Sequence, residues 1–404
     1  MRIELLRKRE NFNDGFIASL SDFLKNKIQW QGKMYWCDVV PPKNLKNATI
    51  YHVNDLLNVI YPSSIERSKL APFTKEFSYN PNIARRVLQS VYVFAAVRFP
   101  VEIYAVSAKL IIEDAPLEMK NWVFLPGNHS HRIIDLENDL SLVFTKRGFN
   151  SDFLHVDAST RLSYPSLPCP RVLDYCGAQK WYIEQKVTGL PINRLHHQLD
   201  RDKAIQQANG AMQSLYNSTR KDELLVCYVR QLVQCIQHQI NAIKAQLTIA
   251  ECDELRLFVK KLELLIFQSV PKDKEMITLV MSHGDYQAAN ILWDEPSIWL
   301  IDWEYAGQRT LYFDYFCYAL NSRFSDGLAT RIELLISKLE KHGLYNDFAA
   351  GILHSQLHYL WLFFMEELSL KLSEVSTAEI KSKMTNIIPW VKEVRTVNLF
   401  NVDK

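Results

Sequence analysis

The sequence of 404 residues predicts an α+β protein in which a small antiparallel sheet with one helix precedes a long, mainly helical part. Two observations predict this class. Short strand-like runs separated by turn residues occupy the region from about residue 120 to residue 188. From residue 189 onwards, most segments place apolar residues at positions i, i+3, i+4 and i+7, which is the spacing of amphipathic helices.

The region before residue 189 is predicted to contain five strands and one helix. Three strand-like runs come first, a segment of helical spacing stops before prolines at 165, 168 and 170, and two further runs complete the sheet. In chain order the segments are NWVFLPGN, HSHRIIDL, LSLVFTKRG, the helical NSDFLHVDASTRLS, PRVLDYCG and KWYIEQKV.

The remaining chain is predicted to be helical, with one interruption. The helical segments are DRDKAIQQANGAMQSLY, ELLVCYVRQLVQCIQHQINAIKAQL, ECDELRLFVKKLELLIF, RIELLISKLEKHG and ILHSQLHYLWLFFMEELSLKL. Residues 1–115 give mixed signals and contain no chemical motif. We therefore expect an accessory domain at 1–115, a sheet lobe at 116–188 and a helical lobe at 189–404.

Composition argues against several classes of partner. Lys and Arg total 47 and Asp and Glu total 45, so a net charge of +2 gives no reason to expect nucleic acid or an anionic membrane. The seven cysteines form no C-x-x-C pair, which indicates thiols in a reducing compartment. Neither a signal peptide nor an apolar run long enough to span a membrane is visible. These features predict a cytoplasmic protein with a small-molecule partner.

The interruption of the helical part has the residues that phosphoryl transfer needs. His283, Gly284 and Asp285 are followed by four residues and then Asn290, and an apolar run later delivers Asp302. Transfer of a phosphoryl group needs a residue that orients the attacking hydroxyl and oxygen ligands that hold Mg²⁺ on the phosphates. Any one of these residues alone is more often a turn residue, but their joint spacing predicts a catalytic loop and a metal site.

The strings HGDYQAANILW and LIDWEYAG resemble the aminoglycoside phosphotransferase and choline kinase superfamily, which comprises small-molecule kinases with a two-lobed, protein-kinase-like fold. The resemblance covers roughly residues 120 to 370. It implies that Asp285 is the catalytic base and that His283 supports the loop. It also implies Asn290 and Asp302 as Mg²⁺ ligands and Asp314, in FDYFCYAL, as a residue that braces the loop.

The same resemblance implies that residues 116–188 form the ATP-binding lobe. Lys146 would hold the nucleotide phosphates, and a loop at residues 126–130 with the single glycine Gly127 would cover them. Asp157 occupies the position where the family generally has the glutamate that pairs with the lysine. Backbone groups around the end of KWYIEQKV would contact adenine, which implicates Glu184, Gln185 and Val187.

The acceptor site is expected in the helical lobe, near Glu304, Tyr305 and Trp361. Aromatic side chains could surround a quaternary amine, with acidic side chains adding negative charge, although aromatic residues at helical spacing are more often core residues. The further candidates are Trp303, Tyr312, Glu366 and Glu367.

Two functions from different classes remain open. The first is an ATP-dependent kinase that phosphorylates a hydroxyl of an amino alcohol, an aminoglycoside or a sugar. The second is a nucleotide-binding pseudokinase that acts as a regulatory or interaction module, which Asp157 in place of glutamate favours. His354 and His358 lack the intervening glutamate of a zinc-protease motif, and no glycine-rich dinucleotide or P-loop motif occurs.

Overall fold

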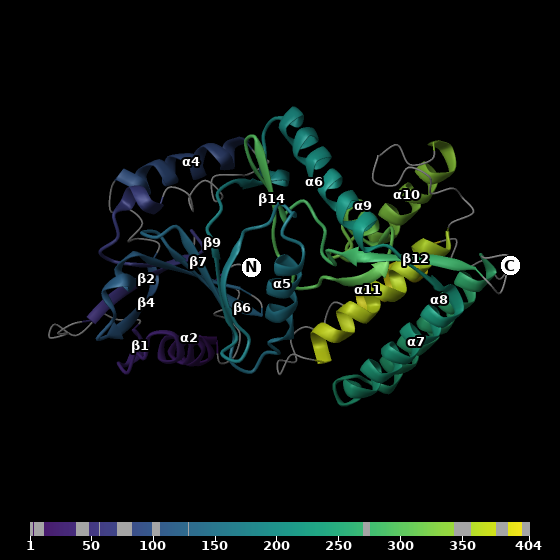
Figure 1. The fold of residues 1–404 in the computed structure, drawn as a ribbon, viewed down its shortest axis with the longest axis horizontal. Helices are drawn as coiled ribbons and strands as arrows, with labels where there is room; N and C mark the ends of the chain where they lie inside the picture. Colours follow the sequence, from purple (N-terminus) through teal and green to yellow (C-terminus); the bar gives the residue numbers. More distant parts are fainter. Residues whose placement is uncertain are drawn as a thin grey trace. The chain divides into compact units, whose positions relative to one another are not determined.

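The computed structural model divides into two compact units, whose elements are labelled in Figure 1. The sheet unit comprises Met1–Pro165, Cys169–Leu190 and Arg194–His196, and the helical unit comprises Ser166–Pro168, Pro191–Asn193 and His197–Lys404. The structure describes residues 3, 12–37, 48–55, 57–70, 83–98, 106–127, 129–269, 275–342, 357–376 and 387–397.

The sheet unit is built on one antiparallel sheet of nine strands in the order β1-β4-β2-β3-β5-β6-β7-β9-β8. The five strands and one helix predicted between residues 120 and 188 are confirmed as β5 to β9 and α5. The bounds are β1 Met34–Cys37, β2 Ala48–Asn54, β3 Val59–Pro62, β4 Val106–Glu113, β5 Trp122–Pro126, β6 Ser130–Asp135, β7 Leu140–Thr145, β8 Val172–Cys176, β9 Trp181–Gln185, α2 Phe12–Ile28, α4 Ile83–Arg98, α5 Asp152–Ser163, η1 Arg67–Leu70 and η3 Leu117–Asn121.

Strands from the first 115 residues belong to this same sheet. β3 pairs with β5 through Ile60 and Phe124, so the hydrogen-bonded ladder crosses the position at which the sequence suggested a domain boundary. In the described structure, the segment expected to be an accessory domain therefore extends the sheet of the expected ATP-binding lobe within one compact unit. The pairing joins residues far apart in the chain, which local sequence patterns do not reveal.

The two faces of the sheet are covered by different helices. On β7, Leu142 and Phe144 join the core cluster that contains Phe23 of α2. Val143 lies between them and packs with Ala158 of α5. Because successive side chains of a strand point to opposite faces, α2 and α5 cover opposite faces of the sheet at β7.

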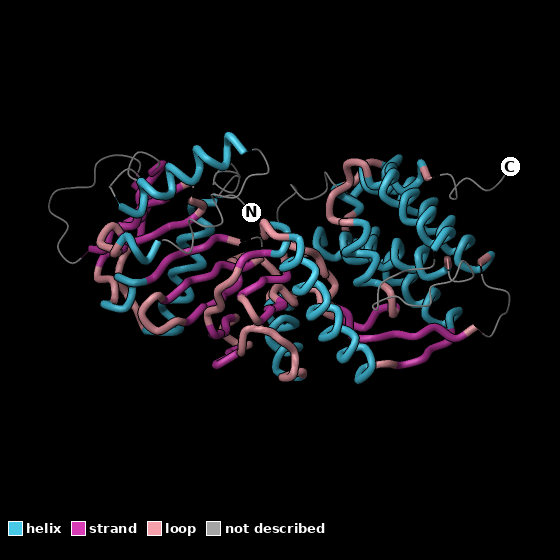
Figure 2. Tube along the Cα trace, turned by 90° about the horizontal axis from the view of Figure 1, so that it is seen from above, coloured by secondary structure: helices cyan, strands magenta, loops and turns pink. Residues whose placement is uncertain are grey.

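The helical unit contains the predicted helices and two small groups of strands, and Figure 2 shows how strongly cyan helices dominate it. α8 begins with a capping box, in which the Thr248 hydroxyl accepts from the Glu251 amide.

Residues 223–224, predicted as the start of a helix, instead end strand β11. The start of the helix predicted from residue 352 lies outside the described residues. The bounds are α6 Gln198–Thr219, α7 Leu225–Ala242, α8 Ile249–Gln268, α9 Phe313–Leu320, α10 Leu328–His342, α11 His358–Ser376, α12 Ile387–Thr396, β10 Leu190–Pro191, β11 Lys221–Leu224, β12 Met276–Ser282, β13 Ile291–Asp294, β14 Ser297–Leu300, β15 Gly307–Thr310, η4 Ile192–Arg194 and η5 Lys244–Gln246.

Among the described residues, no helix has the length and the apolar character that crossing a bilayer requires.

A buried histidine lies on the α2 face of the sheet. The His131 ring is 4.8 Å from the ring of Phe16 and 5.5 Å from that of Phe144, measured between centroids. The side chain is buried, and neither ring nitrogen has a hydrogen-bond partner among the described residues. Burial lowers the pKa of His131 well below its usual value, and the nearby charge of Lys146 lowers it further.

His131 predicts a loss of stability in mild acid. In the unfolded chain the imidazole takes up a proton near pH 6.5, whereas in the fold it stays neutral. The contribution of His131 to the free energy of unfolding is therefore fully present above pH 6.5. As the pH decreases below that value, this contribution is lost by up to about 1.4 kcal/mol per pH unit. The slope of the free energy of unfolding against pH, measured by urea unfolding between pH 7.5 and pH 5, should be smaller for His131→Leu than for the parent chain. Equal slopes would contradict the buried, neutral state of His131.

Candidate functional site

The loop between β12 and β13 holds the predicted catalytic residues, and Gly284 fixes its shape. Gly284 has a φ of +81°, which side chains disfavour. A Cβ atom there would lie 2.0 Å from the backbone oxygen of Tyr305. Only glycine lets the loop approach the segment after Asp302 so closely.

Asp314 holds this loop from the start of α9. Its carboxylate accepts from the His283 amide at 2.8 Å and from the Gly284 amide at 3.0 Å. The Tyr216 hydroxyl of α6 donates to the same carboxylate at 2.8 Å. Asp314 is 1% exposed, so these donors replace the water that a buried carboxylate loses.

His283 connects the loop to the end of β14. Its Nε2 lies 3.0 Å from the carbonyl oxygen of Ile301, and its Nδ1 lies 3.3 Å from the amide nitrogen of Asp285. A carbonyl oxygen can only accept and an amide can only donate, so the ring is the neutral tautomer with its proton on Nε2. The ring also packs on Trp303. His283 therefore holds Asp285 in register with the segment that contains Asp302.

The Asp285 carboxylate is buried and receives three side-chain donors among the described residues. Oδ1 accepts from Arg323 Nε at 2.9 Å. Oδ2 accepts from Gln287 Nε2 at 2.9 Å and from Asn290 Nδ2 at 3.1 Å. Two carboxylate oxygens offer about four acceptor positions, so one position on Oδ1 remains for a further donor such as a hydroxyl group.

The β13–β14 hairpin sets the relation between Asn290 and Asp302. Ile291 pairs with Leu300, and the Ile301 amide donates to the Asn290 carbonyl at 3.0 Å. Asn290 therefore lies immediately before the hairpin, and Asp302, with an exposed side chain and a φ of +70°, lies just after it. Asn290 makes its bonds to Asp285 through Nδ2, which directs the amide oxygen elsewhere.

These residues fit a divalent cation in part. Among the described residues, no group of three or more His, Cys, Asp or Glu side chains forms a complete metal cage. The Asn290 amide oxygen and the Asp302 carboxylate are hard oxygen donors of the kind that Mg²⁺ takes from proteins. Mg²⁺ usually takes only one or two such carboxylates, with water and phosphate oxygens filling its other positions. The donor set is therefore compatible with Mg²⁺ bound to nucleotide.

Arg323 is part of the site, although no sequence motif predicted it. Besides Asp285, it pairs with Glu374 of α11 at 2.7 Å, and its guanidinium lies 4.4 Å from the centroid of the Tyr305 ring. Burial disfavours its charged form, but the carboxylates of Asp285 and Glu374 hold the pKa of Arg323 well above its usual value. Arg323 therefore stays charged and ties Asp285 to α11. No local pattern marks a contact across 38 residues.

In the sheet unit, Asp157 and Glu184 share one buried arginine. Arg161 of α5 lies 2.8 Å from the Asp157 carboxylate and 2.6 Å from that of Glu184. Tyr182 also donates to Asp157 at 2.8 Å, and Arg132 lies 3.2 Å from Glu184. The cation of Asp157 here is thus a residue of its own helix. The Glu184 side chain is bound in the interior, where the sequence suggested that only its backbone matters.

Lys146 lies just beyond β7, and its side chain is largely buried. Its Nζ is 5.5 Å from the ring centroid of Phe149, and its charge acts on His131.

Gly127 turns the chain from β5 into β6, since its amide donates to the Ser130 carbonyl. In the predicted phosphate-covering loop, Asn128 lies outside the described residues. Gln185 is exposed and Val187 is half-buried.

The residues expected at the acceptor site are mostly buried. Trp361 is 3% exposed and packs against Phe364, and Tyr305 packs under Arg323. Glu304 is half-buried. Glu366 accepts from the Thr310 amide and hydroxyl and from Tyr228, which is a structural role. Trp303, Glu366 and Glu367 are also buried.

Substitution of Gly284 provides a test of the loop geometry. Gly284→Ala should destabilise the helical unit by more than about 2 kcal/mol, because the side chain meets both an unfavourable φ and the Tyr305 backbone. Gly210→Ala is the matched control, since Gly210 is a glycine of α6 with open space around it. It should stabilise by about 0.5–1 kcal/mol. Similar urea midpoints for the two variants would show that the loop does not require glycine.

Arg323 gives a second test. Arg323→Met leaves the Asp285 and Glu374 carboxylates without their cation and should cost about 3–5 kcal/mol in urea unfolding. Arg256→Met removes an exposed arginine of α8 that lies 3.6 Å from Asp253, and should change stability by less than about 1 kcal/mol. A cost for Arg323→Met as small as that of the control would mean that Arg323 does not hold the site together.

Comparisons with known proteins found similar solved structures and one matching family model. No curated protein sequence matches it. Among solved structures, a choline/ethanolamine kinase family protein from Mesorhizobium loti is 14% identical, with 68% of this chain and 92% of that chain covered and a TM-score of 0.39. A choline kinase from Streptococcus pneumoniae is 12% identical, with 70% and 92% covered and a TM-score of 0.43. An aminoglycoside phosphotransferase from Streptomyces rimosus is 15% identical, with 62% and 93% covered and a TM-score of 0.38.

A sequence model of the phosphotransferase enzyme family matches residues 156–335, a segment that contains the loop of Asp285, the β13–β14 hairpin and Arg323. This match to the phosphotransferase enzyme family agrees, within residues 156–335, with the resemblance that the motifs around Asp285 and Asp302 indicated.

Proposed function

We propose that the protein is an ATP-dependent kinase that transfers the γ-phosphate to a hydroxyl group of a small molecule. The observation that supports this most is the arrangement of Asp285, Asn290 and Asp302 around one hairpin. A carboxylate to orient a hydroxyl and two oxygen ligands for Mg²⁺ are the groups that phosphoryl transfer takes from a protein. The match of residues 156–335 to the phosphotransferase family supports the same reaction class.

Asp285 is the proposed catalytic base. The remaining acceptor position on its Oδ1 would receive the hydrogen of the acceptor hydroxyl, and the three donors that bind the carboxylate would keep its direction fixed. Arg323 would act as a positioning residue, because it binds Oδ1 of Asp285 and is itself held by Glu374 of α11. His283 and Asp314 would hold the loop without touching the substrate.

Asn290 and Asp302 are the proposed ligands of Mg²⁺, which neutralises the charge of the nucleotide phosphates when it is bound. In the sheet unit, Lys146 and the Gly127 turn are proposed to contact the phosphates. The adenine base is proposed to contact the end of β9, around Glu184, Gln185 and Val187. Asp157 would contribute indirectly, since its ion pair with Arg161 fixes α5 against β9.

The proposed acceptor is an amino alcohol, an aminoglycoside or a sugar. Glu304 and Tyr305 come shortly after Asp302, the proposed metal ligand. The sequence Asp-Trp-Glu-Tyr-Ala-Gly that contains them resembles choline kinases, which favours a choline-like acceptor. Trp361 is buried in the helical unit and is proposed to help shape the acceptor pocket. We expect this reaction in the cytoplasm.

A regulatory pseudokinase is the second candidate, and the pairing of Asp157 with Arg161 is the observation that favours it. In an active kinase of this kind, the carboxylate at this position is expected to pair with the lysine that holds the nucleotide phosphates. Here the Asp157 carboxylate is bound by Arg161 of its own helix. Nucleotide binding without turnover would support this candidate.

Turnover measurements separate the two candidates. ADP release with Mg²⁺ and ATP should be stimulated by at least one member of a panel of choline, ethanolamine, aminoglycosides and monosaccharides. Asp285→Asn should lower that stimulated rate by about 10²- to 10⁴-fold, because a catalytic base contributes a factor of this order. Asp302→Asn should weaken binding of Mg²⁺-ATP, whereas Asp285→Asn should bind it nearly as tightly as the parent chain.

Asp326→Asn is the control, since Asp326 is an exposed residue of the same unit and should retain full activity. ATP binding without stimulation by any acceptor would reject the kinase proposal for this panel. Full activity of Asp285→Asn would reject the assignment of the base.

A further inference from the structure

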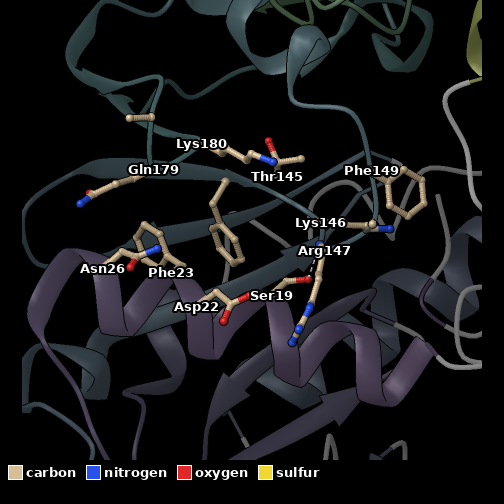
Figure 3. Close-up of a pocket in the computed structure, with 13 residues that line it drawn as sticks. Ser19, Asp22, Phe23, Asn26, Thr145, Lys146, Arg147, Phe149, Gln179 and Lys180 are labelled. Atoms are coloured by element: carbon tan, nitrogen blue, oxygen red, sulfur yellow. Dashed lines mark hydrogen bonds between the residues drawn. The ribbon is translucent and has the colours of Figure 1, made fainter.

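Two features of the sheet unit are candidates for a further binding surface, a pocket and the helix α4. Figure 3 shows the pocket, which has a volume of about 290 Å³ and is lined by α2, the segment after β7 and the turn between β8 and β9. Phe23 and Phe144 line it, but both are buried and their rings stack on each other, so they offer a ligand little apolar surface. α4, at the periphery of the unit in Figure 1, exposes much more.

The large apolar residues of α4 face solvent. Ile83, Val87, Leu88, Val91 and Phe94 are between 55% and 73% exposed. Their spacing of i, i+4, i+5, i+8 and i+11 places them on one side of the helix, and we call these five residues the α4 patch. Single exposed apolar side chains are common on proteins, whereas a group of this size on one helix marks a site of interaction.

α4 joins its own unit through its other side. Tyr92 packs against the core cluster that contains Leu57 and Val123, and the side-chain oxygen of Gln89 is buried. The helix also contacts η1. A surface helix normally turns its apolar side toward the core and its polar side toward water. α4 does the reverse, so the α4 patch is not the surface by which the helix is held in the fold.

α4 also carries positive charge without negative charge. Its sequence contains Arg85, Arg86 and Arg98 and neither Asp nor Glu, so three positive residues give the helix a formal charge of +3. The whole chain carries only +2. The near-neutral total, which gave no reason to expect an anionic membrane, therefore does not describe this helix. An apolar side combined with arginines at both ends is typical of helices that lie in the surface of an anionic bilayer.

Two other occupants of the α4 patch fit less well. A second copy of the chain would bring together two helices of charge +3, and like charges repel. A protein partner generally forms about one hydrogen bond for every 100–200 Å² of interface. The five side chains of the α4 patch have no donor or acceptor to offer, whereas the acyl chains of a lipid require none.

We propose that α4 docks the protein on the surface of an anionic lipid bilayer. The helix would lie in the plane of the surface, with the α4 patch at the boundary of the headgroups and acyl chains. Its arginines would be level with the lipid phosphates. The proposal does not depend on the kinase assignment, because α4 precedes the matched residues 156–335 and contains none of the proposed site residues.

The test is sedimentation of the full chain with lipid vesicles. Vesicles of phosphatidylcholine and phosphatidylglycerol in equal parts should carry the parent chain into the pellet, and vesicles of phosphatidylcholine alone should carry much less. A higher salt concentration should weaken binding to the anionic vesicles. Leu88→Asp and Val91→Asp should each lower the partition coefficient about tenfold or more, since each removes an apolar side chain and adds a negative charge.

Leu257→Asp is the matched control, because Leu257 is a leucine of α8 that is 61% exposed. Its partition coefficient should equal that of the parent chain. Urea midpoints of the three Asp variants should stay close to that of the parent chain, since all three positions are exposed.

Three results would overturn the proposal: no binding to the anionic vesicles, equal binding to both kinds of vesicle, or equal partition coefficients for Leu88→Asp and Leu257→Asp. Sedimentation velocity without lipid checks the second copy. A parent chain that is dimeric and becomes monomeric in Leu88→Asp would assign the α4 patch to self-association and would also overturn the proposal. No turnover is measured, so these outcomes are separate from those of the kinase assay.

Discussion

The carboxylate of Asp314 is the group on which the candidate active site depends. It accepts hydrogen bonds from two successive backbone amides, at His283 and Gly284, and so fixes the turn that precedes Asp285. The same turn lies against the Tyr305 backbone, where only a glycine fits. One buried acidic residue at the start of α9 therefore sets the position of the proposed base relative to the segment that contains Asp302. Any other shape of the turn would leave the buried amides of His283 and Gly284 without a hydrogen-bond partner, which is costly.

The two units solve a similar electrostatic problem in similar ways. In the helical unit Arg323 lies between the carboxylates of Asp285 and Glu374, and in the sheet unit Arg161 lies between those of Asp157 and Glu184. A single planar guanidinium can donate to two carboxylates at once, which offsets part of their buried negative charge. Arg323 connects the loop of Asp285 with α11, and Arg161 connects α5 with β9. Each unit thus gains a fixed orientation for an acidic side chain.

The extension of the sheet changes what the sheet unit can do. Among the described residues, the first 115 supply β1 to β4 and α2, which covers the face of β7 opposite α5. On that face, Phe23 of α2 and Phe144 of β7 are buried in one core cluster. The extension is therefore part of one compact unit with the expected nucleotide lobe, and it adds a surface that the strands β5 to β9 alone do not have.

The sequence by itself predicted the α+β class, the strands β5 to β9 with α5, most helices of the second unit, and the spacing of Asp285, Asn290 and Asp302. These features are local, because they follow from periodicity and from residues a few positions apart. Only the tertiary structure decided that β3 pairs with β5, that Arg161 is the cation of Asp157, and that Arg323 binds Asp285. Asp157 and Arg161 are four positions apart on one helix, so they face the same side and can pair. The other two contacts join residues 38 or more positions apart, and packing alone determines which distant residues meet.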